Sequence, residues 1–160
     1  MNIKDISSEE LRKLVSSLKQ QGITNDSVLN IMSTIQRHIF IEPALRGRAY
    51  DFDALPIGFN QTISSPYIVA KMTQLLIETD SMKNVLEIGT GCGYQTCVLS
   101  ELFEHVTTIE RIKPLFEKTS RLLKSLNYKN ILSIYGDGFE GCKLNAPYDA
   151  IIMTASPSII

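Results

Sequence analysis

The chain has 160 residues, of which 44% are hydrophobic and 21% charged, the composition of an ordinary globular domain. Its 16 basic and 17 acidic residues give a net charge of −1, so no broad positive field supports binding to nucleic acid. The three cysteines show no C-x-x-C spacing and indicate reduced thiols of a cytoplasmic protein rather than disulfides or a zinc site. No apolar run suits a signal peptide or a membrane span, so we expect no membrane contact.

Two short helices are predicted at the start of the chain. The sequence S-S-E-E from Ser7 to Glu10 is a capping box, and apolar residues then recur at helical spacing. Gly22 is placed to end this helix, and Asn25 or Asp26 can cap the next one. We expect the two helices to form a cap that packs against the main sheet.

An irregular segment follows, from Phe40 to Ser65. Arg37 and His38, just before it, are interpreted as a solvated helix end, with a functional role as the alternative. The segment contains two prolines and two glycines, which favours a long loop, but its apolar content argues against disorder. We expect it to fold over a glycine-rich turn further along the chain and to form one wall of a pocket.

Apolar strand patterns alternate with helical patterns over the rest of the chain. The predicted strands are 84–88, 105–110, 130–135 and 147–154, and the predicted helices begin at Pro66 and span about 93–102 and 113–126. This alternation predicts an α/β fold whose sheet is mostly parallel with right-handed crossovers.

The most informative stretch is N-V-L-E-I-G-T-G-C-G-Y-Q-T, residues 84–96. A buried strand, three glycines at alternate positions and a helix form the turn that cradles phosphates or nucleosides in doubly wound folds. A dinucleotide fingerprint would need glycine where Tyr94 stands, so a nicotinamide dehydrogenase is disfavoured. Glu87, inside the strand, would repel a pyrophosphate but suits a cationic amine. A glycine-rich turn without a ligand is the alternative.

Acidic residues follow the next two strands. Glu110 lies 17 residues after Gly93 (110 − 93 = 17), where an acid can accept hydrogen bonds from both hydroxyls of a ribose. Asp137 lies in a G-D-G turn and is placed to take the exocyclic amine of an adenine. Each alone could be a solvated turn residue. Because the carboxyl ends of parallel strands meet at one edge of a sheet, we expect them to belong to one site.

Several motifs together resemble the protein-L-isoaspartate O-methyltransferases, a class I family that uses S-adenosyl-L-methionine. They are D-A-L-P-I-G-F-N-Q-T-I-S-S-P-Y-I-V-A-K-M-T at 53–73, the glycine motif, E-R-I-K-P-L at 110–115, Y-G-D-G at 135–138 and P-Y-D-A-I-I-M-T at 147–154. The Q-T-I-S-x-P part is the most specific. The resemblance implies a Rossmann-like fold with helices on both faces of the sheet. Within a single domain, residues 1–65 would hold the N-terminal helical cap and the substrate loop, and 66–160 the cofactor-binding core.

The resemblance also implies roles for individual residues, with S-adenosyl-L-methionine as the cofactor and no metal. The implied cofactor-binding residues are Glu87, Gly89, Gly91, Gly93, Glu110, Asp137 and Gly138, and the implied substrate-binding residues are Ile63, Ser64 and Ser65. The acceptor would be the free α-carboxylate of an isoaspartyl residue in a damaged protein or peptide, whose methyl ester then closes to a succinimide and starts repair. That carboxylate is ionised at neutral pH and needs no general base. Ser64 is therefore interpreted as a catalytic hydroxyl that positions the carboxylate, not as a nucleophile.

The family pattern continues beyond residue 160, so the C-terminal strands are expected to be missing from the sheet. The strand near 149–154 would then be an exposed edge through which the chain could associate with itself. Two alternatives stay open: a fragment that binds S-adenosylmethionine with little or no turnover, and a methyltransferase for another small acceptor.

Overall fold

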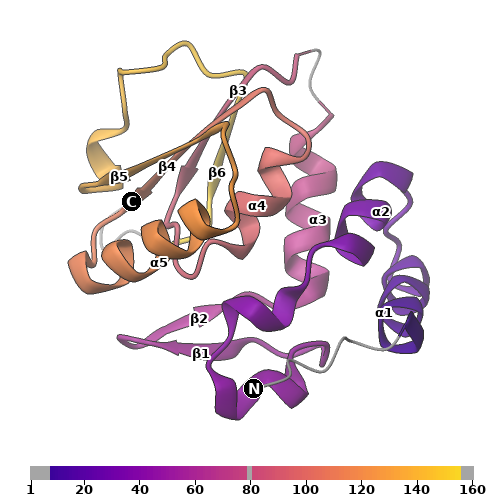
Figure 1. The fold of residues 1–160 in the computed structure, drawn as a ribbon. Coiled ribbons are helices and arrows are strands. Elements are labelled where there is room, and N and C mark those ends of the chain that lie inside the picture. Colours follow the sequence, from indigo (N-terminus) through magenta and orange to yellow (C-terminus); the bar gives the residue numbers. More distant parts are fainter. Residues whose placement is uncertain (1–7, 79–80, 156–160) are drawn as a thin grey trace.

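A computed structural model of the protein, which describes residues 8–78 and 81–155, contains a parallel four-stranded sheet flanked by helices (Figure 1). The strands are β3 (Asn84–Ile88), β4 (His105–Glu110), β5 (Ile131–Tyr135) and β6 (Ala150–Met153). Their order is β5-β4-β3-β6, with β5 and β6 at the edges of the sheet. The predicted α/β class is confirmed, and each strand lies within one residue of its predicted range or inside it.

The two N-terminal helices are present as predicted. Helix α1 (Ser8–Gln20) ends before Gly22, whose φ is 89°, and α2 (Asp26–Thr34) is capped by Asn25, which accepts a hydrogen bond from the Val28 amide at 3.1 Å. Both helices pack against α3 (Pro66–Leu76), at the side of the molecule far from β5, and not against the main sheet as expected (Figure 1). Ser7, the first residue of the predicted capping box, lies outside the described residues.

The segment between α2 and α3 is ordered, as predicted, but it is not a loop throughout. It forms two short 3₁₀ helices, η1 (Arg37–Phe40) and η2 (Pro43–Arg48), and an antiparallel hairpin of β1 (Leu55–Gly58) and β2 (Gln61–Ile63). The sequence did not reveal the hairpin because its turn is Phe59-Asn60, with φ of 54° and 55°, instead of the usual Asn-Gly or Asp-Gly.

One face of the sheet is covered by helices. Strand pairing places Glu87 beside Thr108 and Ile152, so these side chains point to the same side. Thr96 of α4 (Tyr94–Ser100) bonds to Glu87, and Ser120 of α5 (Lys113–Ser125) bonds to Ser133 of β5, which pairs with Thr108. Helices α4 and α5 therefore lie on this face. Helix α3 lies there too, because Met72 and Leu76 pack against the apolar cluster that contains Leu99 of α4.

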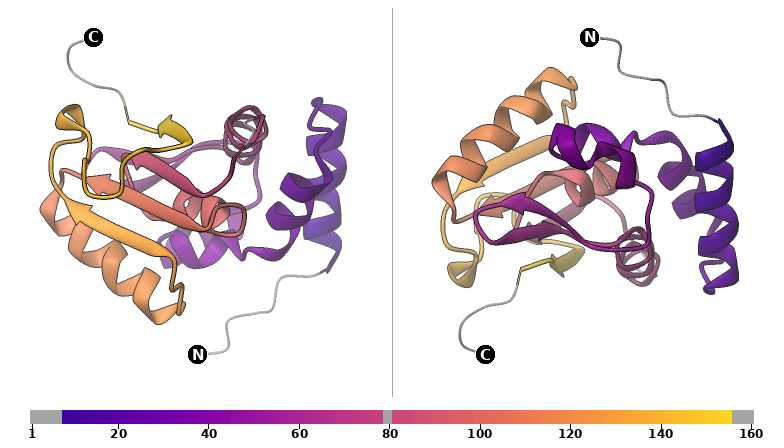
Figure 2. Two further views of the ribbon diagram at one scale, coloured as in Figure 1. Left: turned by 90° about the horizontal axis from the view of Figure 1, so that it is seen from above. Right: turned by 90° about the horizontal axis from the view of Figure 1, so that it is seen from below.

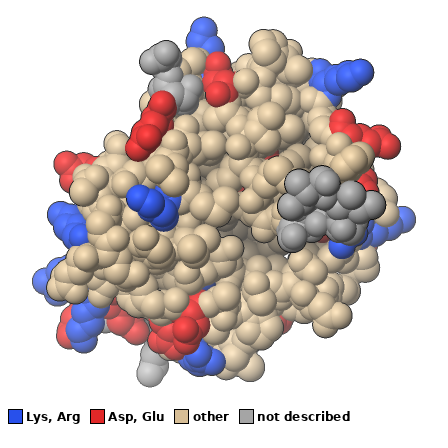
Figure 3. All heavy atoms as spheres, turned by 180° about the vertical axis from the view of Figure 1, so that it is seen from behind, with Lys and Arg blue, Asp and Glu red and all other residues tan. Residues whose placement is uncertain are grey.

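The opposite face carries the crossover from β5 to β6, whose only helical turn in the described residues is the three-residue η3 (Gly138–Glu140). Figure 2 shows this segment on the side of the strands away from α5. Helices were expected on both faces of the sheet, but in the described residues they cover one face. The crossover on the other face contains a single helical turn, which is too little to form a layer. Ile151 and Met153 of β6 stay 58% and 51% exposed. Seen from behind, the middle of the surface is largely uncharged, with charged side chains toward its rim (Figure 3).

Candidate cofactor and acceptor site

The glycine turn after β3 has backbone torsions that favour glycine. The φ angles of Gly89, Gly91 and Gly93 are 98°, 55° and 88°, all in the left-handed region. Gly91 is held from both sides: its amide donates to Glu110 Oε2 at 2.9 Å, and its carbonyl accepts from Thr119 Oγ1 at 2.6 Å. The turn is thus clamped between β4 and α5.

Close packing is a second reason for glycine around this turn. A Cβ on Gly89 would lie 2.6 Å from the Ala155 Cβ, and one on Gly93 would lie 2.9 Å from Thr119 Cγ2. Gly138 meets the end of β3 in the same way, because its Cβ would lie 2.3 Å from Ile88 Cγ2. The G-D-G turn is therefore packed directly beside the start of the glycine turn.

Glu110 lies at the glycine turn, where the sequence predicted it. Its side chain is buried; Oε2 accepts from the Gly91 amide, and Oε1 accepts from the Ile112 amide at 2.9 Å. A carboxylate has about four lone-pair positions, so these two bonds leave acceptor capacity for ligand hydroxyls.

Asp137 is exposed at the same edge of the sheet. Its Oδ1 accepts from the Phe139 amide at 3.0 Å and so caps η3, while the preceding Gly136 amide donates to the Glu110 carbonyl at 3.1 Å. Asp137 and Glu110 thus belong to adjacent strand ends. A contact between Asp137 and adenine stays a prediction.

Glu87 has a different surrounding from the other acids. Its side chain has no exposed surface, and Oε2 accepts from Thr96 at 2.5 Å and from Thr108 at 2.6 Å, whereas Oε1 has no hydrogen-bond partner. Burial raises the pKa of Glu87 to about 7, against the opposing effect of the two hydroxyls. Because its bonds go to α4 and β4, the carboxyl does not itself line the hollow described next.

A hollow separates the glycine turn from the segment that precedes α3. It is lined on one side by Thr62, Ile63, Ser64 and Val69, and on the other by Gly89, Thr90, Gly91, Cys92, Tyr94, Gln95 and Thr154. The predicted wall is therefore confirmed, with half-buried Ser64 facing the same hollow as the turn. Ser65 is the N-cap of α3 and accepts from the Ile68 amide at 3.4 Å, which gives it a structural task.

Arg37 hydrogen-bonds to the wall of the hollow that carries Ser64. The prediction that it lies at a solvated helix end is wrong. The side chain is completely buried; Nε donates to the Ala49 carbonyl at 2.8 Å and Nη2 to the Ser64 carbonyl at 2.7 Å. The guanidinium carbon lies 4.9 Å from the centre of the Tyr94 ring. His38 is buried too. Helix α2 ends at Thr34, so the chain has already turned inward when it reaches these two residues.

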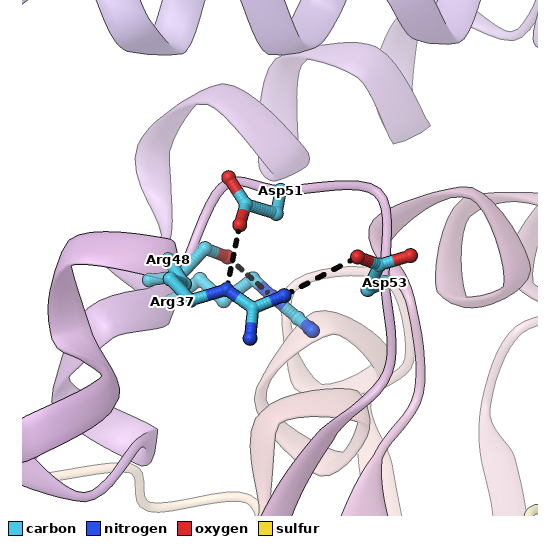
Figure 4. A network of polar contacts seen from close by, with 5 residues as sticks. Arg37, Arg48, Asp51 and Asp53 are labelled. Atoms are coloured by element: carbon cyan, nitrogen blue, oxygen red, sulfur yellow. Dashed lines mark hydrogen bonds and ion pairs between the residues drawn. The ribbon is translucent and has the colours of Figure 1, made fainter.

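No acidic side chain among the described residues forms an ion pair with Arg37, and burial lowers the pKa of its guanidinium. Figure 4 shows the contrast with exposed Arg48, whose nitrogens lie 3.0 Å from Asp51 and 3.3 Å from Asp53. Sequence reasoning missed the importance of Arg37. The available signal was an arginine set among the apolar residues of I-Q-R-H-I-F.

Two further features were sought in the part of the chain that the structure describes. Within residues 8–78 and 81–155, no group of three or more His, Cys, Asp or Glu side chains is arranged to hold a metal ion. No helix in these ranges is long and apolar enough to cross a membrane.

Comparison with known proteins gives consistent matches along the chain. The family model described as protein-L-isoaspartate(D-aspartate) O-methyltransferase matches residues 9–160. A protein-L-isoaspartate O-methyltransferase of Pseudomonas fluorescens is 48% identical over 143 residues, which cover 89% of this chain and 68% of the relative. One from Pseudoalteromonas atlantica is 49% identical over 154 residues, which cover 96% of this chain and 73% of the relative.

Solved structures agree with these matches. A structure of a protein-L-isoaspartate O-methyltransferase superposes with a TM-score of 0.78 and 27% identity, over 90% of this chain and 47% of that one. A putative protein-L-isoaspartate O-methyltransferase from Plasmodium falciparum, in complex with S-adenosyl-L-homocysteine, gives a TM-score of 0.77 and 24% identity, over 93% of this chain and 75% of that one. The chain thus spans about half the length of the first structure and roughly two thirds to three quarters of the other relatives.

Proposed function

Because the chain belongs to the protein-L-isoaspartate(D-aspartate) O-methyltransferase family, we propose that its hollow binds S-adenosyl-L-methionine against the glycine turn and an acceptor carboxylate against Ser64. S-adenosyl-L-methionine is the cofactor of this family, whose reaction methylates the free α-carboxylate of L-isoaspartyl residues and starts their repair through a succinimide. The observation that carries the proposal is that Ser64 and Gly89–Gly91 line the same hollow.

Residues of the glycine turn and of the neighbouring strand ends suit this cofactor. A ligand can approach the backbone closely at Gly91, where an added Cβ would meet only Ile57 Cδ1, at 3.5 Å, and Glu110 keeps acceptor capacity that suits ribose hydroxyls. Asp137 and Gly138 lie at the neighbouring strand end, where they would flank the adenine. The cofactor supplies a methyl group that the positive charge of its sulfonium activates.

The acceptor needs orientation more than activation. A carboxylate is ionised at neutral pH, so no residue has to remove a proton from it. The Ser64 hydroxyl would donate to one carboxylate oxygen and direct the other toward the methyl group, while Ile63 and Val69 help to exclude water from the hollow. Arg37 supports this geometry, because its bond to the Ser64 carbonyl fixes the backbone that carries the hydroxyl.

The proposed partners are isoaspartyl-containing proteins and peptides. We propose a cytoplasmic setting, which is supported by Cys92, Cys97 and Cys142 being free thiols. Self-association through the edge strand β6 is supported by the exposed side chains of Ile151 and Met153. The near-zero net charge and the largely uncharged centre in Figure 3 give no support to nucleic acid as a partner.

Replacing Ser64 by Ala tests the proposal. We expect methyl transfer to an isoaspartyl peptide to fall about a hundredfold or more in kcat/KM, as when one positioned donor is removed from an active site. Calorimetric affinity for S-adenosyl-L-homocysteine should stay within about twofold of that of the unsubstituted chain. Ser16→Ala, on the exposed side of α1, is the matched control and should change neither quantity.

The outcomes separate the open alternatives. Unchanged transfer in Ser64→Ala would contradict the role of this serine in positioning the acceptor. Cofactor binding without methyl transfer by the unsubstituted chain would leave a binding unit.

A further inference from the structure

A short chain of hydrogen bonds connects the fully buried carboxyl of Glu87 to the hollow. Thr108 Oγ1 donates to Glu87 Oε2 at 2.6 Å, and Thr108 Oγ1 lies 2.7 Å from Thr90 Oγ1. Glu87 and Thr108 have no exposed surface, and Thr90 is 4% exposed and lines the hollow. No other side chain of the described residues hydrogen-bonds both to Glu87 and to a residue of the hollow wall.

The directions of these bonds follow from counting protons. A hydroxyl carries one proton and two lone pairs. When Thr108 gives its proton to ionised Glu87, it can only accept in its contact with Thr90. The proton of Thr90 then points away from the hollow, and its oxygen keeps a lone pair for a ligand.

The backbone of the turn supports the same polarity. The amides of Gly89 and Thr90 both donate to the Ile109 carbonyl, the Gly91 amide donates to Glu110, and the Gly93 amide donates to the Thr90 carbonyl. Loops that cradle phosphates instead present free amides to the anion. These four amides are already used, so this part of the hollow offers acceptors and favours a cation.

We propose that Thr108 and Thr90 relay the negative charge of Glu87 to the hollow, making Thr90 Oγ1 an acceptor for the ammonium group at the amino-acid end of the cofactor. The inference rests on the proposed function, because it needs S-adenosylmethionine or its product to occupy the hollow. It assigns Thr90 as a binding residue and Thr108 as a positioning residue. It also explains how an acid that does not touch the hollow can still select a cation.

The relay has a pH dependence with a defined sign. Protonation of Glu87 removes the negative charge at the inner end of the relay. Affinity for a ligand whose ammonium group contacts Thr90 should therefore rise with pH through about 7, the pKa to which burial raises Glu87. Glu110 on β4 raises this pKa further through its charge. The other titratable groups near Glu87 are Cys92 and Cys97, whose thiol pKa values burial raises, so they stay neutral in this range.

Two threonines bond to the same oxygen of Glu87, which supplies a matched pair of variants. Thr108→Val interrupts the relay, whereas Thr96→Val removes an equal bond to Glu87 without touching Thr90. The probes are S-adenosyl-L-homocysteine, which carries the ammonium group, and 5′-methylthioadenosine, which has the same nucleoside without the amino-acid end.

Calorimetric titration should show that Thr108→Val lowers the affinity for S-adenosyl-L-homocysteine about tenfold, the loss expected for one hydrogen bond to a charged group. Binding of 5′-methylthioadenosine should stay within about twofold, and Thr96→Val should leave both affinities within about twofold. The rise of S-adenosyl-L-homocysteine affinity with pH should disappear in Thr108→Val and persist in Thr96→Val.

Unchanged S-adenosyl-L-homocysteine affinity in Thr108→Val, or an equal loss for both ligands, would overturn the relay and leave the proposed function intact. Absence of S-adenosyl-L-homocysteine binding by the unsubstituted chain would overturn both. Should Thr108→Val fail to fold, Thr90→Val and Thr90→Ser decide the question, because only the serine variant keeps the relay hydroxyl and should retain the ligand preference.

Discussion

The hollow has two walls, the cofactor wall at Gly89–Gly91 and the acceptor wall at Thr62–Ser64. They face one another but are held by different kinds of contact. The glycine turn has its backbone amides and carbonyls bonded to β4 and α5, through Ile109, Glu110 and Thr119. The acceptor wall, which carries Ser64, is held by the pairing of Ile63 with Leu55 and by Arg37, a buried cation from η1 that bonds to backbone carbonyls and not to an acid. The cofactor wall is therefore held by bonds within the sheet layer, whereas the acceptor wall adds one long-range buried side chain to the pairing of its hairpin.

The largest loss of stability is expected when a methyl group is added to the closely packed glycine turn of the cofactor wall. Gly93→Ala would force a Cβ to within 2.9 Å of Thr119 and 3.2 Å of Leu123, at a φ of 88°. Overpacking and left-handed strain together should lower the free energy of unfolding by about 3 kcal/mol. Urea denaturation followed by circular dichroism measures this loss.

Gly22→Ala is the matched control for Gly93→Ala. Gly22 has a φ of 89° but no atom within 4 Å of its added Cβ, so only strain remains, about 1 kcal/mol. Equal losses in the two variants would show that packing does not hold the cofactor wall.

A smaller effect is expected in the acceptor wall. Arg37→Met keeps an apolar stem but leaves the carbonyls of Ala49 and Ser64 without their donors, which should cost about 2 kcal/mol of unfolding free energy. The KM for an isoaspartyl peptide should rise while the affinity for S-adenosyl-L-homocysteine is retained, because the change lies on one wall only.

Arg48→Met is the control for Arg37→Met. Its two ion pairs are exposed and should contribute less than about 1 kcal/mol. Arg37→Met could instead weaken binding of the peptide and of S-adenosyl-L-homocysteine to the same extent. The two walls would then not be held independently, contrary to the comparison.

The smallest effect is the pH dependence of stability that Glu87 contributes. Its pKa rises from 4.5 to about 7 on folding, so the folded chain binds a proton that the unfolded chain has already released. Stability from this group is complete below about pH 4.5 and is lost as pH rises through about 7, with a limiting slope of about 1.4 kcal/mol per pH unit.

Comparing Glu87→Gln with the unsubstituted chain in urea isolates this contribution. The difference in unfolding free energy between the two should change with pH in this window. Glu117→Gln, an exposed change on α5, is the control and should follow the unsubstituted chain. A pH-independent difference for Glu87→Gln would mean that burial does not raise the pKa of Glu87.

Much of the cofactor wall could be predicted because its signals are local. The strand, three glycines and helix follow one another within 84–100, and the positive φ angles and short packing distances explain why glycine stands there. Glu110 was also predictable, since the carboxyl ends of neighbouring parallel strands must meet. The orientation of Glu87 was not, because its bonds to Thr96 and Thr108 depend on how α4 lies across the sheet.

The acceptor wall was predictable only in part. Ser64 could be named from the Q-T-I-S-x-P motif, and the structure brings it to the hollow. The hairpin before it and the burial of Arg37 have no periodic signal, because an irregular segment takes its shape from contacts distant in sequence. The helix-free face of the sheet had the same origin, in a crossover whose path the sequence pattern does not specify.

By itself, the sequence determined the succession of strands and helices along the chain, the glycine turn and the family. These depend on hydrophobic period and turn chemistry, which are properties of neighbouring residues. Only the tertiary structure decided that Arg37 supports Ser64 and that Glu87 meets the hollow through two threonines. Both facts concern buried polar groups, whose partners are set by which elements pack together and not by the residues beside them in the chain.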